Sequence, residues 1–290
     1  MKVLFWGTRG NIPQPSYETL SLGGNTSCVQ LFYDSPDYNK DGTVIQEADD
    51  NKFFIIDMGT GIIEFGKDKP FYNEYHIIIC SFYWDYIQGL PFFLHIHRPD
   101  VKIHLYTPAN KTLTSKNLNT LFDGTYSPLE NINNLQAEIL YEKIPTTGKN
   151  INGVKVYNYI VDPKHTVSAI KICYKKKKFV YAGNFEINLN HPELNKFIDF
   201  IKEADMFVCD AQHTEVQYLD NKGWGHSNID NTIELGVRAN VKRLLLFHHD
   251  PFNADRFLKG YLNHILKYRN DTNNIYIDFA KEGKNNIIEF

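Results

Sequence analysis

The sequence has few cysteines, and none lie in the paired spacing of a disulfide framework. The four are scattered along 290 residues, three of them in or at the end of apolar runs: Cys28, Cys80, Cys173 and Cys209. Buried, reduced thiols are typical of proteins in the reducing cytosol. We therefore expect no disulfide bond and a cytoplasmic location.

The sequence also lacks long apolar runs and any excess of basic charge. No run approaches the ~20 residues that cross a bilayer, and the short apolar run after Lys2 is too brief for a signal peptide. The formal net charge of −3 gives no basic field to attract nucleic acid or anionic lipid. We expect no membrane association and no general nucleic-acid binding. Hydrophobic residues make up 42% of the chain, enough to bury a sizeable core.

Short runs rich in β-branched and aromatic residues recur, separated by Gly, Asn, Asp and Pro. They predict strands at residues 3–6, 28–33, 53–57, 76–80, 101–106, 154–161, 169–174, 179–182, 206–209 and 243–247. Helical periodicity predicts helices at 194–204, 228–239 and 255–268, the second capped by Ser227 or Asn228.

The early strands form hairpin-like clusters, whereas the later strands alternate with helices. Two sheets sandwiched between helices satisfy both patterns. Residues 35–52 indicate a hairpin tip or an insertion, residues 117–136 an irregular excursion, and lysine-rich residues 175–178 a solvated hairpin turn. Because no long linker and no internal repeat divides the chain, we expect a single domain over residues 1–290.

Glycine-bearing loops flank the first three predicted strands. They read Trp6-Gly7-Thr8-Arg9-Gly10, Gly23-Gly24-Asn25-Thr26-Ser27-Cys28 and Asp57-Met58-Gly59-Thr60-Gly61. Taken singly, each is a turn in which glycine permits a positive φ or a close backbone approach. Further motifs follow in order: Cys80-Ser81-Phe82-Tyr83-Trp84-Asp85-Tyr86, Tyr181-Ala182-Gly183-Asn184, Asp210-Ala211-Gln212, Gly223-Trp224-Gly225-His226-Ser227 and Leu246-Phe247-His248-His249-Asp250-Pro251.

Together and in this order, the motifs resemble the metallo-β-lactamase superfamily, in the cyclic-nucleotide-phosphodiesterase-like branch related to tRNase Z. The resemblance runs from residue 1 to about residue 252. It implies a four-layer αβ/βα sandwich, of the α+β or α/β class, with a pocket at the loop end of the two sheets. Relatives in this branch are often homodimers, so we expect a homodimer here.

Members of that family hold two Zn or Mn ions and use the activated water to hydrolyse phosphodiesters. Their ligands are a His-x-His-x-Asp-His loop, a further His, a bridging Asp and a last His. The resemblance places seven residues of this sequence at those positions: Ser81, Tyr83, Asp85, Tyr86, His165, Asn184 and His248. Metal-binding side chains remain at three of them, Asp85, His165 and His248.

Those three ligands would be divided between two metals, whereas a catalytic zinc usually needs three protein ligands of its own. The resemblance therefore implies a degenerate site without a metal; the alternative is one Zn or Mn ion on Asp85, His165 and His248. Asp57 would brace the ligand loop as an outer acceptor. His226 would lie near the pocket and contact a bound ligand.

Structural roles compete with these assignments. Asp85 precedes a helix, so it could equally accept hydrogen bonds from the backbone at the end of that helix. Either His248 or His249 could instead cap the local backbone. Four aromatic residues flank the loop that holds the family's metal ligands. Because the run is apolar on both sides, we expect them in the core or the pocket wall and not as platforms for base stacking: Phe82, Trp84, Phe92 and Phe93. Histidines that match no ligand position are expected at the surface or at strand edges: His76, His95, His97, His104, His191 and His264.

Two functions follow as hypotheses. The first is a pseudoenzyme without a cofactor, which binds a protein partner or a small phosphoester-type ligand. The second is a phosphodiesterase-like hydrolase with a single-metal or metal-independent site built from Asp85, His165, His226 and His248. A second subunit that completes the pocket is a third possibility.

Overall fold

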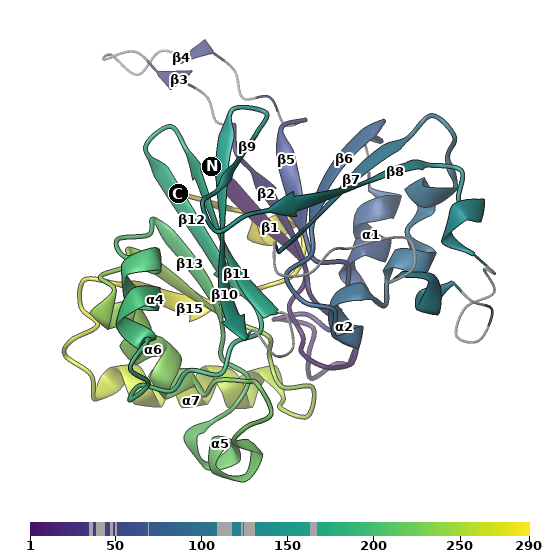
Figure 1. Ribbon diagram of the computed structural model, residues 1–290. Helices are drawn as coiled ribbons and strands as arrows, with labels where there is room; N and C mark the ends of the chain where they lie inside the picture. The colour runs from purple at the N-terminus through teal and green to yellow at the C-terminus, as the bar shows by residue number, and fades with distance from the viewer. Residues whose placement is uncertain are drawn as a thin grey trace.

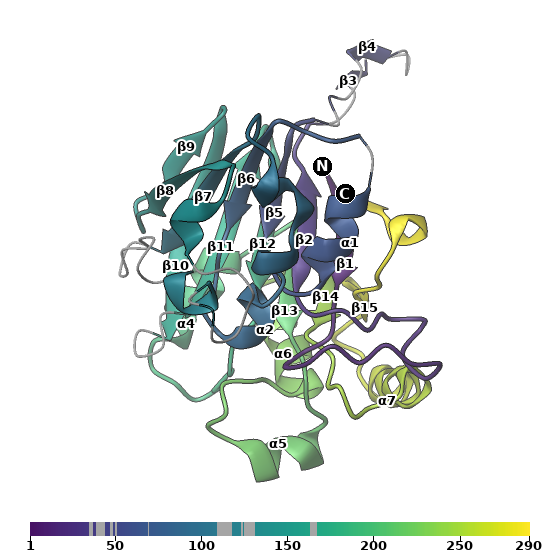
Figure 2. The same ribbon diagram turned by 90° about the vertical axis from the view of Figure 1, so that its right-hand side faces the viewer.

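The computed structural model describes residues 1–34, 37–38, 44–46, 49, 51–68, 70–108, 118–122, 124, 131–162 and 167–290. Two seven-stranded sheets face each other, and helices cover their outer faces (Figure 1, Figure 2). The predicted four-layer αβ/βα sandwich is confirmed.

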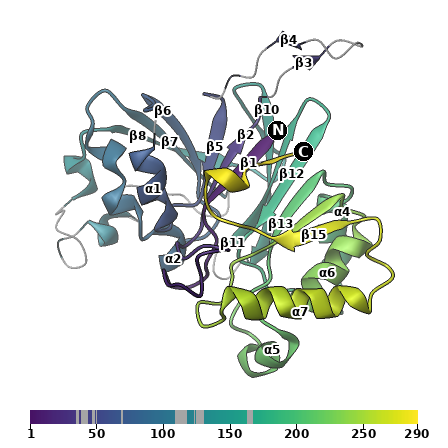
Figure 3. The ribbon, with the colours of Figure 1, turned by 180° about the vertical axis from the view of Figure 1, so that it is seen from behind.

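The first sheet has the strand order β16–β1–β2–β5–β6–β7–β8. Its strands are Ile288–Glu289, Lys2–Gly7, Cys28–Phe32, Phe53–Ile56, Glu74–Ile78, Lys102–Pro108 and Glu138–Ile144, in that order. Strands β5 to β8 are parallel, and β1 pairs antiparallel with both β2 and β16. The two chain ends therefore lie close together, as Figure 3 shows.

The second sheet has the order β15–β14–β13–β12–β11–β10–β9. These strands are Tyr276–Phe279, Arg243–Phe247, Met206–Asp210, Lys177–Ala182, Val167–Tyr174, Val154–Asp162 and Lys149–Ile151. Strands β12 to β15 are parallel, so that their carboxyl ends meet at one edge. Short strands β3 (Asp37–Tyr38) and β4 (Val44–Gln46) form a separate hairpin.

Three apolar clusters fill the layers. Strand β5 shows how one strand serves two of them, because successive side chains point to opposite faces. Phe53 and Ile55 pack against α1 (Gly61–Lys67) and its neighbours, whereas Phe54 and Ile56 lie between the sheets. The third cluster lies under helices α4 (Leu194–Ile201), α6 (Ile229–Arg238) and α7 (Asp255–Lys267).

Every predicted strand and helix has a counterpart within a few residues. The elements that were missed are short or weakly patterned. They are the helices α1, α2 (Trp84–Ile87) and α5 (Glu215–Asn221), the strands β8, β9, β15 and β16, and five 3₁₀ turns at Leu90–Phe92, Leu94–His97, Asn119–Leu121, Ile132–Asn134 and Lys284–Asn286. In β8 most side chains are only partly buried, so no strict alternation marks it. The hairpin expected in residues 35–52 matches β3 and β4, and parts of residues 35–52 and 117–136 lie outside the described residues.

Buried thiols were expected, and Cys28, Cys80 and Cys209 are buried while Cys173 is partly exposed; all four are free. The expectation for His95 was wrong, because this residue is buried in the core and its Nε2 pairs with the Gly66 carbonyl at 3.0 Å. Among the described residues, no helix is long and apolar enough to span a membrane.

Candidate functional site

Loops that follow five strands meet at one end of the sandwich. Asp57 follows β5, Ser81 follows β6, Asn184 follows β12, and His248 follows β14, while Asp210 ends β13. The carboxyl ends of parallel strands share an edge, which is where ligands bind in open α/β sheets. The chain thereby brings polar groups from both sheets into one region.

Asp57 holds the loop after β6 in place. It is fully buried and has a φ of 62°, a left-handed conformation that Asp tolerates. One carboxylate oxygen accepts from the Cys80 amide at 2.8 Å, and the other accepts from the Tyr181 hydroxyl at 2.8 Å. Burial raises the pKa of Asp57 to about 8, although both hydrogen bonds oppose the shift.

His248 pairs directly with Asp85. The His248 Nε2 lies 2.8 Å from the Asp85 Oδ2, and its Nδ1 lies 2.9 Å from the Gln212 Oε1. The same Asp85 oxygen accepts from the Asn11 amide at 3.2 Å. His248 is fully buried with a φ of 64°, a left-handed conformation that is uncommon outside glycine, although histidine adopts it more often than most residues. Such strain is kept where surrounding contacts over-determine it.

The His248 ring is stacked between two others. Tyr86 lies on one side, with centroids 5.5 Å apart, and His226 lies 4.7 Å away. The Tyr86 hydroxyl donates to the Gly183 carbonyl. Burial raises the pKa of Tyr86 well above its usual value, so the phenol stays protonated and acts as a donor. Gly10 makes room for the ring, because a Cβ there would lie 2.5 Å from the His248 Nδ1.

Asp210 orients His226. The His226 Nδ1 lies 2.7 Å from the Asp210 Oδ2, while the other oxygen accepts from the backbone amides of Gln212 and Ser227. Burial lowers the pKa of His226, but the charge and hydrogen bond of Asp210 outweigh it and raise the pKa above 6.5. A carboxylate-held imidazole of this kind can accept or donate a proton near neutral pH.

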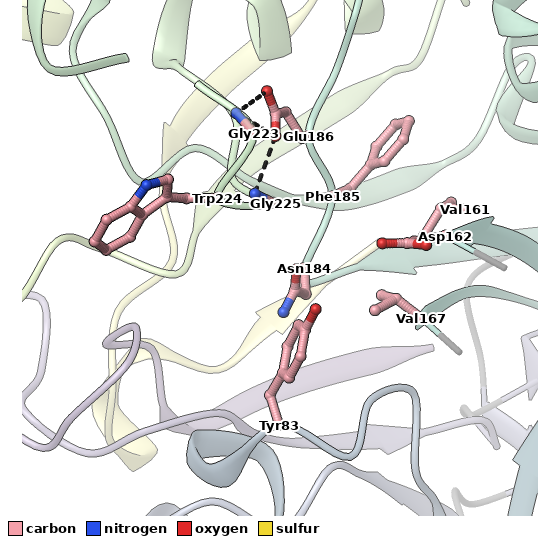
Figure 4. A pocket seen from close by; sticks show the side chains of 10 residues that line it. All are labelled: Tyr83, Val161, Asp162, Val167, Asn184, Phe185, Glu186, Gly223, Trp224 and Gly225. Carbon is pink, nitrogen blue, oxygen red and sulfur yellow. Dashed lines mark hydrogen bonds between the residues drawn. The ribbon is translucent and has the colours of Figure 1, made fainter. Parts of the chain in front are cut away.

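A cavity of about 210 Å³ opens beside Asn184. In Figure 4, the side chains of Asn184 and Tyr83 point toward each other and the Trp224 ring points away from them; all three residues line the cavity. Glu186 also lines the cavity and accepts from the backbone amides of Gly223 and Gly225. The Asn184 Nδ2 is buried and has no hydrogen-bond partner, so one donor is left unsatisfied.

The remaining residues predicted from the motifs are placed as follows. Ser81 is buried, and its hydroxyl accepts from the Tyr83 amide at 3.2 Å. His165 lies outside the described residues. Of the loop aromatics, Phe93 is buried in the core and Phe82 packs against it, whereas Trp84 and Phe92 are about half exposed; the core expectation fails for those two.

Motif analysis assigned no role to Asp210 or Gln212, although both stand in a quoted motif. Asp210 and Gln212 contact His226 and His248. Their signal was the position directly after an apolar strand, which puts a side chain at the functional edge of a parallel sheet.

Among the described residues, one buried group of side chains at this edge offers atoms that could bind a metal. A tetrahedral site with ligands at about 2.0–2.1 Å keeps its ligand atoms roughly 3.3 Å apart. Asp210, His226 and His248 offer three buried donor atoms within 4.8 Å of one another. However, the 2.7 Å His226–Asp210 contact is a hydrogen bond, and the His248 Nδ1 faces Gln212. Asn184 contributes an amide without negative charge where the family has its bridging carboxylate.

Solved structures share this architecture at low sequence identity. The metallo-β-lactamase fold protein YhfI from Bacillus subtilis is 15% identical, with a TM-score of 0.66 over 100% of this chain and 98% of that chain. The short form of human tRNase Z is 16% identical, with a TM-score of 0.63 over 100% and 99%. Zn²⁺-bound PqqB from Methylobacterium extorquens is 12% identical, with a TM-score of 0.67 over 100% of both chains.

No protein-family model matches the sequence, and no curated protein matches it either. The structural similarity nevertheless spans the whole chain and both sheets. On its layers, its strand order and these similarities, the chain has the metallo-β-lactamase fold.

Proposed function

We propose that this protein is a pseudoenzyme that binds a small phosphoester-type ligand without a metal ion. The observation that carries the proposal is the direct 2.8 Å pairing of His248 with Asp85. By resemblance, both residues would be ligands of the same metal. Here they satisfy each other, so this buried polar network is complete without a cation.

The choice of ligand rests on the unsatisfied donor of Asn184, a residue that lines the cavity. The Asn184 Nδ2 needs an acceptor, and phosphoryl oxygens are strong acceptors. The Glu186 carboxylate is already occupied by two backbone amides and by the Tyr218 hydroxyl, which reduces its repulsion of an anion. A neighbouring cavity of about 380 Å³ shares Phe185 and Val161 and leaves room for an organic substituent.

Binding is tested by calorimetry with bis-p-nitrophenyl phosphate and a cyclic nucleotide, in buffer containing EDTA. We expect N184A to weaken binding by about 10-fold, since a hydrogen bond to a charged group contributes about 1.5 kcal/mol. N190A is the matched control, because Asn190 is exposed and lines neither cavity. Binding that needs added Mn²⁺ or Zn²⁺, or that N184A leaves unchanged, would contradict the proposal.

Catalysis is tested by a reversion. The natural sequence should not hydrolyse bis-p-nitrophenyl phosphate with Mn²⁺ or Zn²⁺ added, because no dication lowers the pKa of water from about 15.7 toward 7. The comparison protein carries S81H, Y83H, Y86H and N184D. Additional metal bound by this variant, beyond any that the natural sequence binds, supports the proposal; turnover by the natural sequence rejects it.

A metal-independent hydrolase remains the second candidate, and the Asp210–His226 pair favours it. A general base alone typically raises the reaction rate by about 10²–10⁴-fold, which is small beside the acceleration that phosphodiester hydrolysis requires. H226A decides between the two candidates: a hydrolase would lose turnover, whereas a pseudoenzyme would have none to lose.

A further inference from the structure

We propose that the protein has a second, previously unassigned site, which binds a divalent cation of the zinc class through Glu74, His76 and His104. This site lies at the opposite end of β6 from Ser81, because Glu74 and His76 begin that strand and Ser81 follows its end. It is independent of the proposed function, since it shares no residue with the cavity beside Asn184.

The sheet itself brings the three side chains together. His76 and His104 are direct partners in the parallel pairing of β6 with β7, and their rings stack with centroids 4.7 Å apart. Glu74 lies two residues before His76 and so on the same face of the strand. One donor atom from each of the three lies within 4.8 Å of the others. Two imidazoles and one carboxylate form a donor set that zinc accepts.

The Glu74 carboxylate contacts both imidazoles. The Glu74 Oε1 lies 3.0 Å from the His104 Nε2 and 3.5 Å from the His76 Nε2, close to the roughly 3.3 Å separation in a tetrahedral site. The buried His104 Nε2 nevertheless makes no hydrogen bond in this position.

Outer partners fix both rings through their other nitrogen, as around most metal-bound histidines. The His104 Nδ1 lies 2.8 Å from the Glu142 carboxylate, and the His76 Nδ1 lies 3.0 Å from the Tyr106 hydroxyl. The other Glu142 oxygen pairs with Lys149 at 2.6 Å. This arrangement leaves both Nε2 atoms on the side of the Glu74 carboxylate.

The His76 Nε2 already has a polar neighbour from outside the first sheet. The Asn152 amide, in the turn between β9 and β10, lies 2.9 Å from the His76 Nε2 and occupies the position that a cation would take. Because Asn152 belongs to the second sheet, binding there would change a contact between the two sheets.

The test is calorimetric titration of Zn²⁺ into full-length protein that was first stripped with a chelator. We expect one Zn²⁺ per chain, with binding lost in H104Q and in E74Q. Glu74 is more than half exposed, so E74Q does not threaten folding. E142Q, which removes only an outer partner, should weaken binding by about 10- to 100-fold. Co²⁺ absorption should report a tetrahedral site in the wild type.

H226A is the matched control, because it disrupts the other buried cluster of potential ligands. Zn²⁺ binding should survive H226A unchanged. The proposal is overturned if stripped wild-type protein binds no Zn²⁺, if H104Q and E74Q bind it as the wild type does, or if H226A abolishes binding.

Discussion

At the residue scale, Asp57 stands out because a buried carboxyl group braces the loop on which Ser81, Tyr83 and Asp85 lie. Its two acceptor contacts come from different sheets, since Cys80 follows β6 and Tyr181 belongs to β12. The cost of burying its charge appears as a pKa of about 8. This links the geometry of the candidate site to the pH dependence of stability.

The sign of that dependence follows from proton binding. An unfolded chain has an Asp pKa of about 3.9, so between pH ~4 and ~8 the folded state holds a proton that the unfolded state has released. The contribution of Asp57 to the free energy of unfolding therefore falls as pH rises, by at most about 1.4 kcal/mol per pH unit. We expect D57N to lose less stability than the wild type between pH 5 and pH 7.5, in urea unfolding.

D205N is the control for this comparison. Burial raises the pKa of Asp205, but contacts from Lys242 and the Lys178 amide outweigh it and lower the pKa below its usual value. Its contribution is lost only as pH falls below about 4, so D205N should shift stability equally at both pH values. Equal slopes for D57N and the wild type would show that Asp57 is ionised when folded.

The sequence predicted single site residues better than the pairs they form. The family resemblance placed Asp57, Asn184 and His248 near one pocket, and in the structure each follows a strand that ends at the same edge. The His248–Asp85 contact joins residues 163 positions apart. Its existence depends on how the two sheets pack, which no local pattern encodes.

At the element scale, helices α6 and α7 could be predicted because an apolar stripe at helical spacing is buried against the second sheet. The seven-residue helices α1 and α5 are too short to show such a stripe. Strand β8 escaped detection because its exposed charged residues weaken the alternation. The sequence pattern thus revealed the elements that are long and have a clearly buried apolar face, and it missed those that are short or only partly buried.

Two glycines should respond to alanine in opposite ways. Gly260 is an exposed residue in α7, with nothing within 4 Å of an added Cβ, so G260A should stabilise the protein by about 1 kcal/mol. In G10A the Cβ would lie 2.5 Å from the His248 ring, and overpacking of this kind costs about 1–3 kcal/mol. Chemical denaturation measures both, and a stabilising G10A would show that the His248 ring can move.

At the scale of the whole molecule, we predict that the protein is a homodimer. Four apolar side chains near the start of α7 are at least about half exposed: Tyr17, Leu20, Phe252 and Phe257. Exposed apolar patches often mark protein interfaces. Light scattering at micromolar concentration should give twice the 33.7 kDa chain mass, and L20E with F252E should restore the monomer. A wild-type mass near 33.7 kDa would exclude the dimer.

The positions of the four thiols allow the unfolding of the two sheets to be followed separately. Cys28 lies in the first sheet and Cys209 in the second, both fully buried, and C173S would remove the accessible thiol. An alkylating reagent reaches a buried thiol only when its surroundings unfold locally or globally. The labelling rate of Cys28 in dilute denaturant therefore reports how often the first sheet unfolds, and the labelling rate of Cys209 reports the same for the second sheet. Identical free energies of opening would mean that neither sheet survives the loss of the other.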